Sequence, residues 1–408
     1  MDAITLTPMA DALSTLQLLL AEHNLDGYLI TDFRGSSLTL PRVLPAQAGA
    51  RRWTTRRVGL LITATGKPTL LASAIDEGQF PPAAYPQLDI QVFISWQQWQ
   101  AHLTAFAKRC PKLAMDYSPD CQLPVVSTAD AGTVEFVRSA GAQIVSSADL
   151  VQQALATWSA EAIAGHERAS KLVDGIKDEA FAMVRDALAA GRTICEHDVA
   201  EHIVRRFGEC GLETRDCPVV ACNEHAADPH YEPSAAHRSE IRRGDLILLD
   251  LWARLPGEEH IFSDISWMAM AGVPSARQSE IFASVCAARD ASLAAAQSAW
   301  QAKRGVRGYE LDDAARHLLI ARGLEGGIKH RTGHSLSPGP LVHGVGMNLD
   351  NLETHDYRVM LPGTGFTIEP GIYLPNERIG VRSEINVFVD PVRGPIVTSG
   401  VQKELVRV

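Results

Sequence analysis

The 408-residue sequence lacks the features of a membrane-spanning or disulfide-stabilised protein. No apolar stretch approaches the ~20 residues that a transmembrane helix needs. The N-terminal segment has no basic region ahead of its apolar residues, so we expect an amphipathic helix there and no signal peptide. The seven cysteines are scattered and form no C-x-x-C pair, which argues against a disulfide framework or a zinc knot. These absences predict a protein of the reducing cytoplasm with no membrane partner.

An excess of basic charge is also missing. The chain has 38 Lys and Arg against 48 Asp and Glu, giving a formal net charge of -10. Such an acidic chain is not expected to bind nucleic acid. The motifs G-x-S-x-G, the P-loop and G-x-G-x-x-G are absent as well. The 46% of hydrophobic residues instead indicates a globular protein, long enough for two or three separate cores.

The first part of the chain, residues 1–155, alternates helical stretches with short apolar runs. The runs are GYLITDF at 27–33, VGLLITA at 58–64, KPTLLAS at 67–73 and LDIQVFIS at 88–95, and a helical pattern follows at 96–108. Alternation of this kind predicts an α/β domain with a mixed sheet.

The second part, residues 156–408, shows the same order of elements twice. A long helix is expected from the N-cap Ser159 to about residue 190, and a second helix begins where Thr193 and Glu196 have capping-box spacing. Pro274 then starts another long helix to about residue 303, followed by a short helix at 310–322. Each helix pair precedes strand-like runs, which in the second half cover 340–346, 365–374 and 381–389. The pattern predicts an α/β (α+β) fold with an internal pseudo-two-fold repeat, whose two hairpins lie side by side on one sheet.

Each predicted hairpin carries one carboxylate per strand among apolar neighbours: Asp250 and Asp264 in the first, Glu369 and Glu384 in the second. Burying an ionised carboxylate costs several kcal/mol unless a positive group compensates it. His330, His334 and His343 lie between the hairpins, in a segment whose glycines, such as Gly333, allow close backbone approach. Four carboxylates and one imidazole would suit a pair of divalent cations held mainly by oxygen. Such a site favours Mn²⁺ over structural zinc.

Five motifs give the chain a family resemblance. They are NEHAADPHYEP at 223–233, SDIS at 263–266, TGH at 332–334, PGTGFTIEPGIY at 362–373 and GVRSE at 380–384. With these motifs the chain resembles the pita-bread metallopeptidases, which include Xaa-Pro aminopeptidases, prolidases and methionine aminopeptidases. The resemblance covers 160–408 closely and 1–150 more loosely. It implies a creatinase/prolidase-type N-terminal domain at 1–155 and a pita-bread catalytic domain at 156–408.

The resemblance also implies roles for individual residues. The metal ligands would be Asp250, Asp264, His334, Glu369 and Glu384. Asp264 and Glu384 would bridge two divalent ions, most simply Mn²⁺ with Co²⁺ or Zn²⁺ as alternatives. Asp250 would hold one ion, and His334 and Glu369 the other, with Glu369 also moving a proton. The remaining catalytic residues would be His230 and His343, which line the substrate pocket, and Arg382 and Tyr373, which support the site or contact substrate.

The chain departs from the family pattern at several positions. Leu251 and Trp252 follow the first aspartate, and the loop before Asp264 is a few residues longer than usual. About two extra residues stand between His334 and His343, and Asn386 replaces a common threonine. None of these changes removes a ligand, so they bear on the shape of the pocket.

The function that this resemblance implies is hydrolysis of Xaa-Pro dipeptides, closest to a bacterial Xaa-Pro dipeptidase. Alternatives are an Xaa-Pro aminopeptidase acting on longer peptides, a non-peptidase hydrolase or lyase on the same fold, and a catalytically inactive binding module. The chain length and compact N-terminal domain favour the dipeptidase. We also expect a homodimer through the N-terminal domain, with exposed aromatics (Trp53, Trp96, Trp99) and the basic segment 51–57 near the partner's active site.

Overall fold

The computed structural model describes residues 12–46 and 52–408 and shows a mixed α/β protein with two compact units. The first unit ends at Leu155 and the second begins at Ala156. In the described part of the chain, no helix is both long and apolar enough to cross a membrane.

The N-terminal unit is built on a six-stranded sheet with the order β4-β3-β2-β1-β5-β6. Its strands are β1 (Gly27–Phe33), β2 (Arg57–Thr63), β3 (Thr69–Ser73), β4 (Asp89–Phe93), β5 (Lys112–Met115) and β6 (Gln143–Ser146). Its helices are α1 (Ala12–Glu22), α2 (Leu40–Val43), α3 (Trp96–Arg109), α4 (Ala131–Ser139) and α5 (Ala148–Leu155). Antiparallel pairs (β1–β2, β2–β3) and parallel pairs (β1–β5, β3–β4, β5–β6) coexist. The predicted mixed sheet, its first four strands and the helix at 96–108 are therefore confirmed.

The aromatic residues expected on the surface of this unit differ in their exposure. Trp53 and Trp96 are 69% and 61% exposed, but Trp99 is only 3% exposed, so the expectation for Trp99 was wrong. Trp99 packs on Phe93 inside the core, because it lies on the inward face of the amphipathic helix α3. Within the basic segment 51–57, Arg51 lies outside the described residues.

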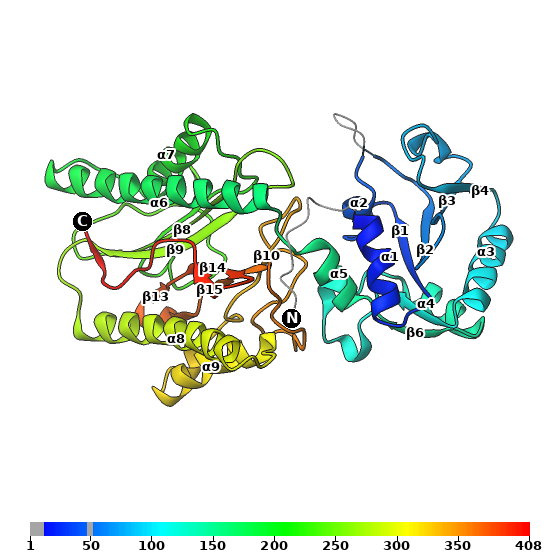
Figure 1. The fold of residues 1–408 in the computed structure, drawn as a ribbon. Coiled ribbons are helices and arrows are strands. Elements are labelled where there is room, and N and C mark those ends of the chain that lie inside the picture. The colour runs from blue at the N-terminus through cyan, green and yellow to red at the C-terminus, as the bar shows by residue number, and fades with distance from the viewer. Residues whose placement is uncertain (1–11, 47–51) are drawn as a thin grey trace. The chain divides into compact units, whose positions relative to one another are not determined.

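The second unit repeats the order of two helices followed by strands, as predicted. The first half contains α6 (Ala160–Ala189), α7 (Glu196–Glu209), β7 (Val219–Cys222), β8 (Leu246–Ala253) and β9 (Ser263–Met270). The second half contains α8 (Ala276–Gln301), α9 (Gly308–Ala321), β10 (Ser335–Leu336), β11 (Gly365–Ile368), β12 (Gly371–Leu374), β13 (Ile379–Arg382), β14 (Ile385–Asp390), β15 (Gly394–Val397) and β16 (Val406–Arg407). Within this unit, α6 runs along one side of the strands and α8 along the other (Figure 1).

The hairpin of β8 and β9 is buried on both faces, which explains its long apolar runs. Ile247, Leu249 and Leu251 pack into the core formed with α6 and α7. Leu246 and Leu248 pack into the other core, with residues of α8, α9 and β13. Side chains alternate along a strand, so Asp250 shares the second face with Leu246 and Leu248. The sequence alternation thus places its carboxylate between the two halves of the unit.

The expected single sheet is wrong, because the strands of this unit form three sheets. Their orders are β16-β9-β8-β7, β10-β11-β14-β15 and β12-β13. The predicted strand 365–374 is broken at Glu369 and Pro370, since proline has no N–H for a sheet ladder. The predicted strand 381–389 is broken at Ser383 and Glu384. A backbone hydrogen bond of 3.2 Å from Glu384 N to Ser266 O still joins the two hairpins.

Two further expectations need correction. The run 340–346 forms no strand in the structure, and the short β10 precedes it. Helix α7 begins two residues later than the capping-box spacing suggested, with Cys195 as the N-cap and Asp198 bonded back to its N–H. Glu196 therefore does not cap the helix. Its side chain is completely buried instead.

Candidate metal centre

A pocket of about 500 Å³ opens in the second unit and contains most of the residues expected at the site. Of the sequence-predicted residues, it is lined by Asp250, Asp264, His334, Glu369, Glu384, His230, His343 and Arg382. Tyr373 lies behind the wall, where its hydroxyl accepts a hydrogen bond of 2.8 Å from Arg382. Segments far apart in the sequence therefore converge on one cavity.

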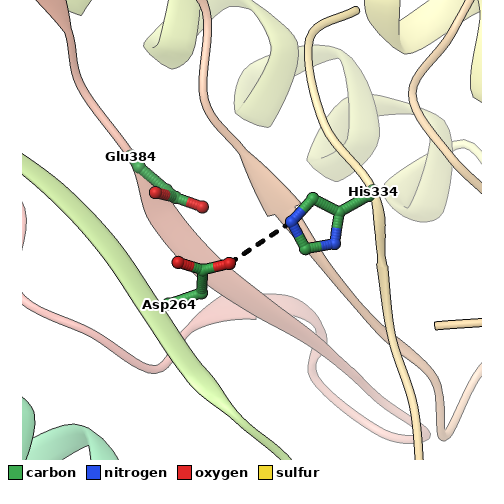
Figure 2. Close-up of side chains that lie close together, drawn as sticks. All are labelled: Asp264, His334 and Glu384. Carbon is green, nitrogen blue, oxygen red and sulfur yellow. Dashed lines mark ion pairs between the residues drawn. The ribbon is translucent and has the colours of Figure 1, made fainter. Parts of the chain in front are cut away.

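Three of these lining residues, Asp264, His334 and Glu384, lie close together (Figure 2). Each offers one ligand atom, and these atoms lie within 4.8 Å of one another. Asp264 comes from β9, His334 from the residue before β10, and Glu384 from the break between β13 and β14. All three are at most 5% exposed. Two acids and an imidazole are therefore brought together out of contact with bulk water.

The orientation of the His334 ring leaves a lone pair facing the carboxylates. Nδ1 lies 3.1 Å from Ser335 O and donates to it, which makes Nε2 the unprotonated nitrogen. Nε2 is 3.3 Å from Asp264 Oδ2 and 3.4 Å from Glu369 Oε1. Burial lowers the pKa of His334 to about 3, so a proton on Nε2 does not balance these acids near neutral pH. A cation placed between His334, Asp264 and Glu369 would balance their charge.

Within the described part of the chain, the two buried acids of the cluster, Asp264 and Glu384, also lack a positive charge that would compensate their ionised form. Burial and the neighbouring carboxylates raise the pKa of both Asp264 and Glu384 well above the ordinary range. Among the atoms that the structure describes, Glu384 Oε1 is buried and has no hydrogen-bond partner. An orphaned carboxylate oxygen beside a free imidazole lone pair fits a divalent metal ion, which accepts both donors at once.

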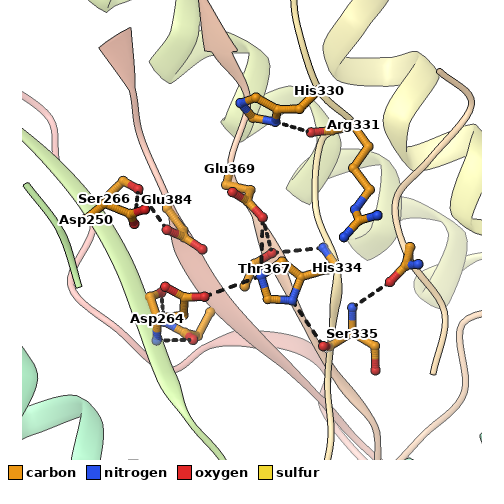
Figure 3. Close-up of polar contacts among 12 residues, drawn as sticks. Asp250, Asp264, Ser266, His330, Arg331, His334, Ser335, Thr367, Glu369 and Glu384 are labelled. Carbon is orange, nitrogen blue, oxygen red and sulfur yellow. Dashed lines mark hydrogen bonds and ion pairs between the residues drawn. The ribbon is translucent and has the colours of Figure 1, made fainter. Parts of the chain in front are cut away.

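Asp250 and Glu369 flank this cluster and are oriented by hydroxyl groups (Figure 3). Ser266 Oγ lies 2.7 Å from Asp250 Oδ1 and 2.9 Å from Glu384 Oε2. On the other side, Thr367 Oγ1 donates to Glu369 Oε1 at 3.0 Å and accepts from His334 N at 3.0 Å. The Ser266 hydroxyl thus links two acids on one side of the centre. The Thr367 hydroxyl links Glu369 to the backbone of His334 on the other side.

Among the residues that the structure describes, Arg382 supplies the positive charge that pairs with Asp250. Its guanidinium forms an ion pair with Asp250, and its Nε donates to Ser266 Oγ at 2.7 Å. Its Nη1 donates to Tyr373, whose hydroxyl in turn lies 2.8 Å from His330 Nε2. Burial raises the pKa of Tyr373 to about 12, so the hydroxyl keeps its proton for this chain of bonds. This series of hydrogen bonds fixes the guanidinium of Arg382 on Asp250. Asp264 and Glu384 are left without a paired cation among the described residues.

Sequence reasoning missed several residues that hold these groups in place. Ser266 and Thr367 carried no signal of their own, although each stands two residues from an acid and so shares its strand face. Asn386 appeared only as a departure from a family pattern. In the structure, its Oδ1 accepts from Asp264 N at 3.0 Å and its Nδ2 donates to Asp264 O at 2.7 Å. Asn386 thereby locks the backbone that carries Asp264.

The glycine of the TGH motif has a steric role. A Cβ on Gly333 would lie 2.1 Å from Thr367 O, which no side chain can occupy. Only glycine therefore brings the segment of His334 against β11. His343 reaches the same place from the following loop, with its ring centroid 4.2 Å from that of His334.

Comparison with known proteins relates the chain to metallopeptidases. The model of metallopeptidase family M24 matches residues 165–391. A probable dipeptidase PepE of Mycobacterium tuberculosis is 32% identical over 212 residues, 52% of this chain and 51% of the relative. An Xaa-Pro dipeptidase of Pyrococcus horikoshii is 31% identical over 174 residues, 42% of this chain and 43% of the relative. Each match therefore spans about half of the relative's length.

The fold extends further than the sequence similarity. The crystal structure of dipeptidase PepE from Mycobacterium ulcerans superposes with a TM-score of 0.71 at 21% identity, covering 100% of this chain and 99% of that one. At 21% identity, this structural similarity is evidence for the fold alone. It includes both units of the present structure.

Proposed function

Because the chain belongs to metallopeptidase family M24, we propose that it hydrolyses the peptide bond before proline in Xaa-Pro dipeptides with a pair of divalent metal ions. The observation that carries this proposal is the set of four carboxylates and one imidazole that line one pocket, in which Glu384 Oε1 is buried and has no partner among the described residues. The names of the two relatives, a probable dipeptidase and an Xaa-Pro dipeptidase, support the choice of substrate.

The residues of the centre divide naturally between two ions. Asp264 and Glu384 lie in the middle and would contact both, Asp250 would hold one, and His334 with Glu369 would hold the other. A set dominated by oxygen favours Mn²⁺, with Co²⁺ or Zn²⁺ as alternatives. Bound ions of this kind polarise the scissile carbonyl and lower the pKa of a water molecule.

The chain's own groups supply proton transfer and positioning. Glu369 is half-buried at the pocket wall, with one oxygen fixed by Thr367. It accepts a proton from the attacking water and delivers it to the departing proline nitrogen. Arg382, which is bonded to Tyr373, holds Asp250, while His343 and His230 line the pocket where the substrate would bind.

The pocket volume supports a small substrate. About 500 Å³ falls within the roughly 300–1,000 Å³ typical of small-molecule sites. Arg331 also lines the wall, with Nη1 3.7 Å from Glu353 Oε2, and would pair with the free carboxylate of a dipeptide. A longer peptide has no carboxylate at that position, so the dipeptidase is preferred here over the aminopeptidase.

A direct comparison of two substrates tests the proposal. Protein loaded with Mn²⁺ is assayed with an Xaa-Pro dipeptide and with the tripeptide that extends it by one residue. We expect kcat/KM to be at least ~10-fold higher for the dipeptide, a difference of about 1.4 kcal/mol in transition-state binding. A preference for the tripeptide would favour the aminopeptidase, and no cleavage of either would reject the peptidase.

We further propose a cytoplasmic homodimer that assembles through the N-terminal unit. The exposed Trp53 and Trp96 support such an interface, since exposed aromatics are enriched at interface cores. All seven cysteines are free thiols, which suits a reducing compartment.

A further inference from the structure

One wall of the pocket is formed by a long connection without regular secondary structure. Residues 223–245 join β7 to β8 and, although the structure describes all of them, contain only turns and one isolated bridge. Pro229, His230, Tyr231 and Glu232 in this connection line the pocket. Connections of this length are uncommon in compact domains unless they serve a function. Because it has no regular secondary structure, the connection 223–245 must be held in its conformation by other contacts.

The side chain of Glu196 makes the contacts that do so. It is 0% exposed, and its carboxylate accepts hydrogen bonds from four positions in and beside the loop. Oε1 accepts from Cys222 N at 2.8 Å, where β7 ends. Oε2 accepts from Tyr231 OH at 2.6 Å and Ser239 N at 2.6 Å, and His225 Nδ1 lies 2.9 Å from the same oxygen. One carboxylate therefore binds the beginning, middle and end of the connection.

One of these contacts fixes Tyr231, which follows His230 directly in the pocket wall. Tyr231 is turned inward, with 3% exposure, and its ring stacks on His225 with centroids 4.0 Å apart. Its neighbours His230 and Glu232 are exposed in the pocket wall. His230 lies in a turn that ends at Tyr231, because Tyr231 N donates to Asp228 O at 3.2 Å and His230 N donates to Asp228 Oδ1 at 3.1 Å. The hydrogen bond from Tyr231 to Glu196 thus anchors the end of the turn that carries His230 into the pocket wall.

Other contacts also place the loop against the metal centre. A Cβ on Gly380 would lie 1.7 Å from Ala226 O, so the loop packs directly on β13, two residues before Arg382. Glu224 pairs with Arg378 at 2.6 Å on the surface of the same contact. The loop is thus fixed between Glu196 on one side and β13 on the other.

The chemistry of the cluster excludes a second metal site as the explanation. Both oxygens of Glu196 already accept short hydrogen bonds, and the metal-competent group found among the described residues is Asp264, His334 and Glu384. A buried carboxylate with this many donors stabilises the conformation of the groups around it.

We propose that Glu196 is a positioning residue for substrate binding, which acts through Tyr231 to hold His230 in the pocket wall. This inference rests on the proposed peptidase function for its kinetic part. Glu196 contacts none of the predicted metal ligands and is not itself among the residues that line the pocket. Its loss is therefore expected to leave metal binding intact and to weaken substrate binding.

The test is Glu196→Gln, which keeps the size of the side chain but replaces one acceptor oxygen with a donor NH₂. We expect an unchanged metal content, hydrogen exchange at least ~10-fold faster across 223–239, and a KM for the dipeptide raised ~10-fold or more with a smaller effect on kcat. Asp116→Asn is the matched control, because Asp116 is a buried carboxylate with hydroxyl partners in the other unit. It is expected to change neither the exchange of 223–239 nor KM.

A double-mutant cycle separates positioning from general destabilisation. If Glu196 acts through His230, then Glu196→Gln added to His230→Ala raises KM less than ~2-fold further. Full additivity, or unchanged exchange across 223–239 in Glu196→Gln, would overturn the proposal. Should Glu196→Gln fail to fold, Tyr231→Phe removes one of the same bonds and is judged by the same exchange measurement. An inactive wild-type protein would reject the peptidase function, while the exchange measurement would still decide the role of Glu196 in the loop.

Discussion

At the scale of single residues, the central question is how acids survive in an apolar interior. Asp264 and Glu384 are nearly completely buried, and the nearest guanidinium, that of Arg382, is paired with Asp250. The sequence revealed these acids because each interrupts an apolar run. It could not reveal Ser266 or Thr367, since hydroxyl residues are ordinary in strands and only the fold shows which carboxylates they contact.

Glu384 is predicted to be essential for metal binding. Glu384→Gln removes the charge that bridges the centre, so we expect the metal content to fall from about two ions per chain to below one and kcat to fall at least ~1,000-fold. Elemental analysis and an activity assay on the same sample check both. His343→Ala serves as the comparison, because it should retain metal and lose turnover. Loss of metal in His343→Ala would move the ligand role from His334 to His343.

Asn386 is predicted to stabilise the strand that carries Asp264. Asn386→Ala leaves the buried N–H and C=O of Asp264 without their partners, which costs about 1–3 kcal/mol for each unsatisfied group. We expect a lower melting temperature and weaker metal affinity, both measured by thermal unfolding with and without Mn²⁺. A melting temperature and metal affinity equal to the wild type would show that Asn386 does not hold Asp264.

At the scale of elements, periodicity predicted helices and strands well and sheet pairing less well. Ser159 caps α6 as expected, because its side chain accepts from Ala162 N. Asp250 and Asp264 lie on the two strands of a hairpin, β8 and β9, as predicted. The breaks at Pro370 and Ser383 were not predicted, since their effect depends on which strand lies opposite. Glu196 was assigned to a capping box from spacing alone. In the structure it is buried against the connection 223–245.

Helix α6 is predicted to make stability depend on pH through His166. The residue is fully buried, with Nδ1 3.0 Å from Phe262 O and Nε2 2.7 Å from Thr398 Oγ1. Burial lowers its pKa from 6.5 to about 4, so the unfolded chain binds the proton more readily. Its contribution to stability is complete above pH 6.5 and is lost as the pH falls towards 4, by roughly 3 kcal/mol.

Thermal unfolding of metal-free protein between pH 4 and 7 checks this prediction. The comparison variant is His166→Gln, which cannot be protonated. The acids of the metal centre remain in both proteins, so the difference between the two curves isolates His166. The difference in melting temperature should change steadily between pH 6.5 and 4. A difference that does not vary with pH would contradict the assignment.

At the scale of the whole molecule, length and composition predicted two or three separate cores, and the family resemblance predicted two domains and their type. Neither could show which aromatics are exposed, as the buried Trp99 demonstrates. We predict a homodimer that depends on the exposed Trp96. Light scattering at micromolar concentration should give twice the chain mass, and Trp96→Glu should shift the protein to monomer. Wild-type protein that is monomeric at that concentration would refute the assembly.

The most direct test of the account is a titration of Mn²⁺ into metal-free protein, followed by calorimetry and by cleavage of an Xaa-Pro dipeptide in parallel. The account predicts no cleavage without metal, binding that saturates at about two ions per chain, and activity that rises with occupancy of the site. Full activity in chelated protein that holds no metal would contradict it, and so would saturation of the pocket without any cleavage.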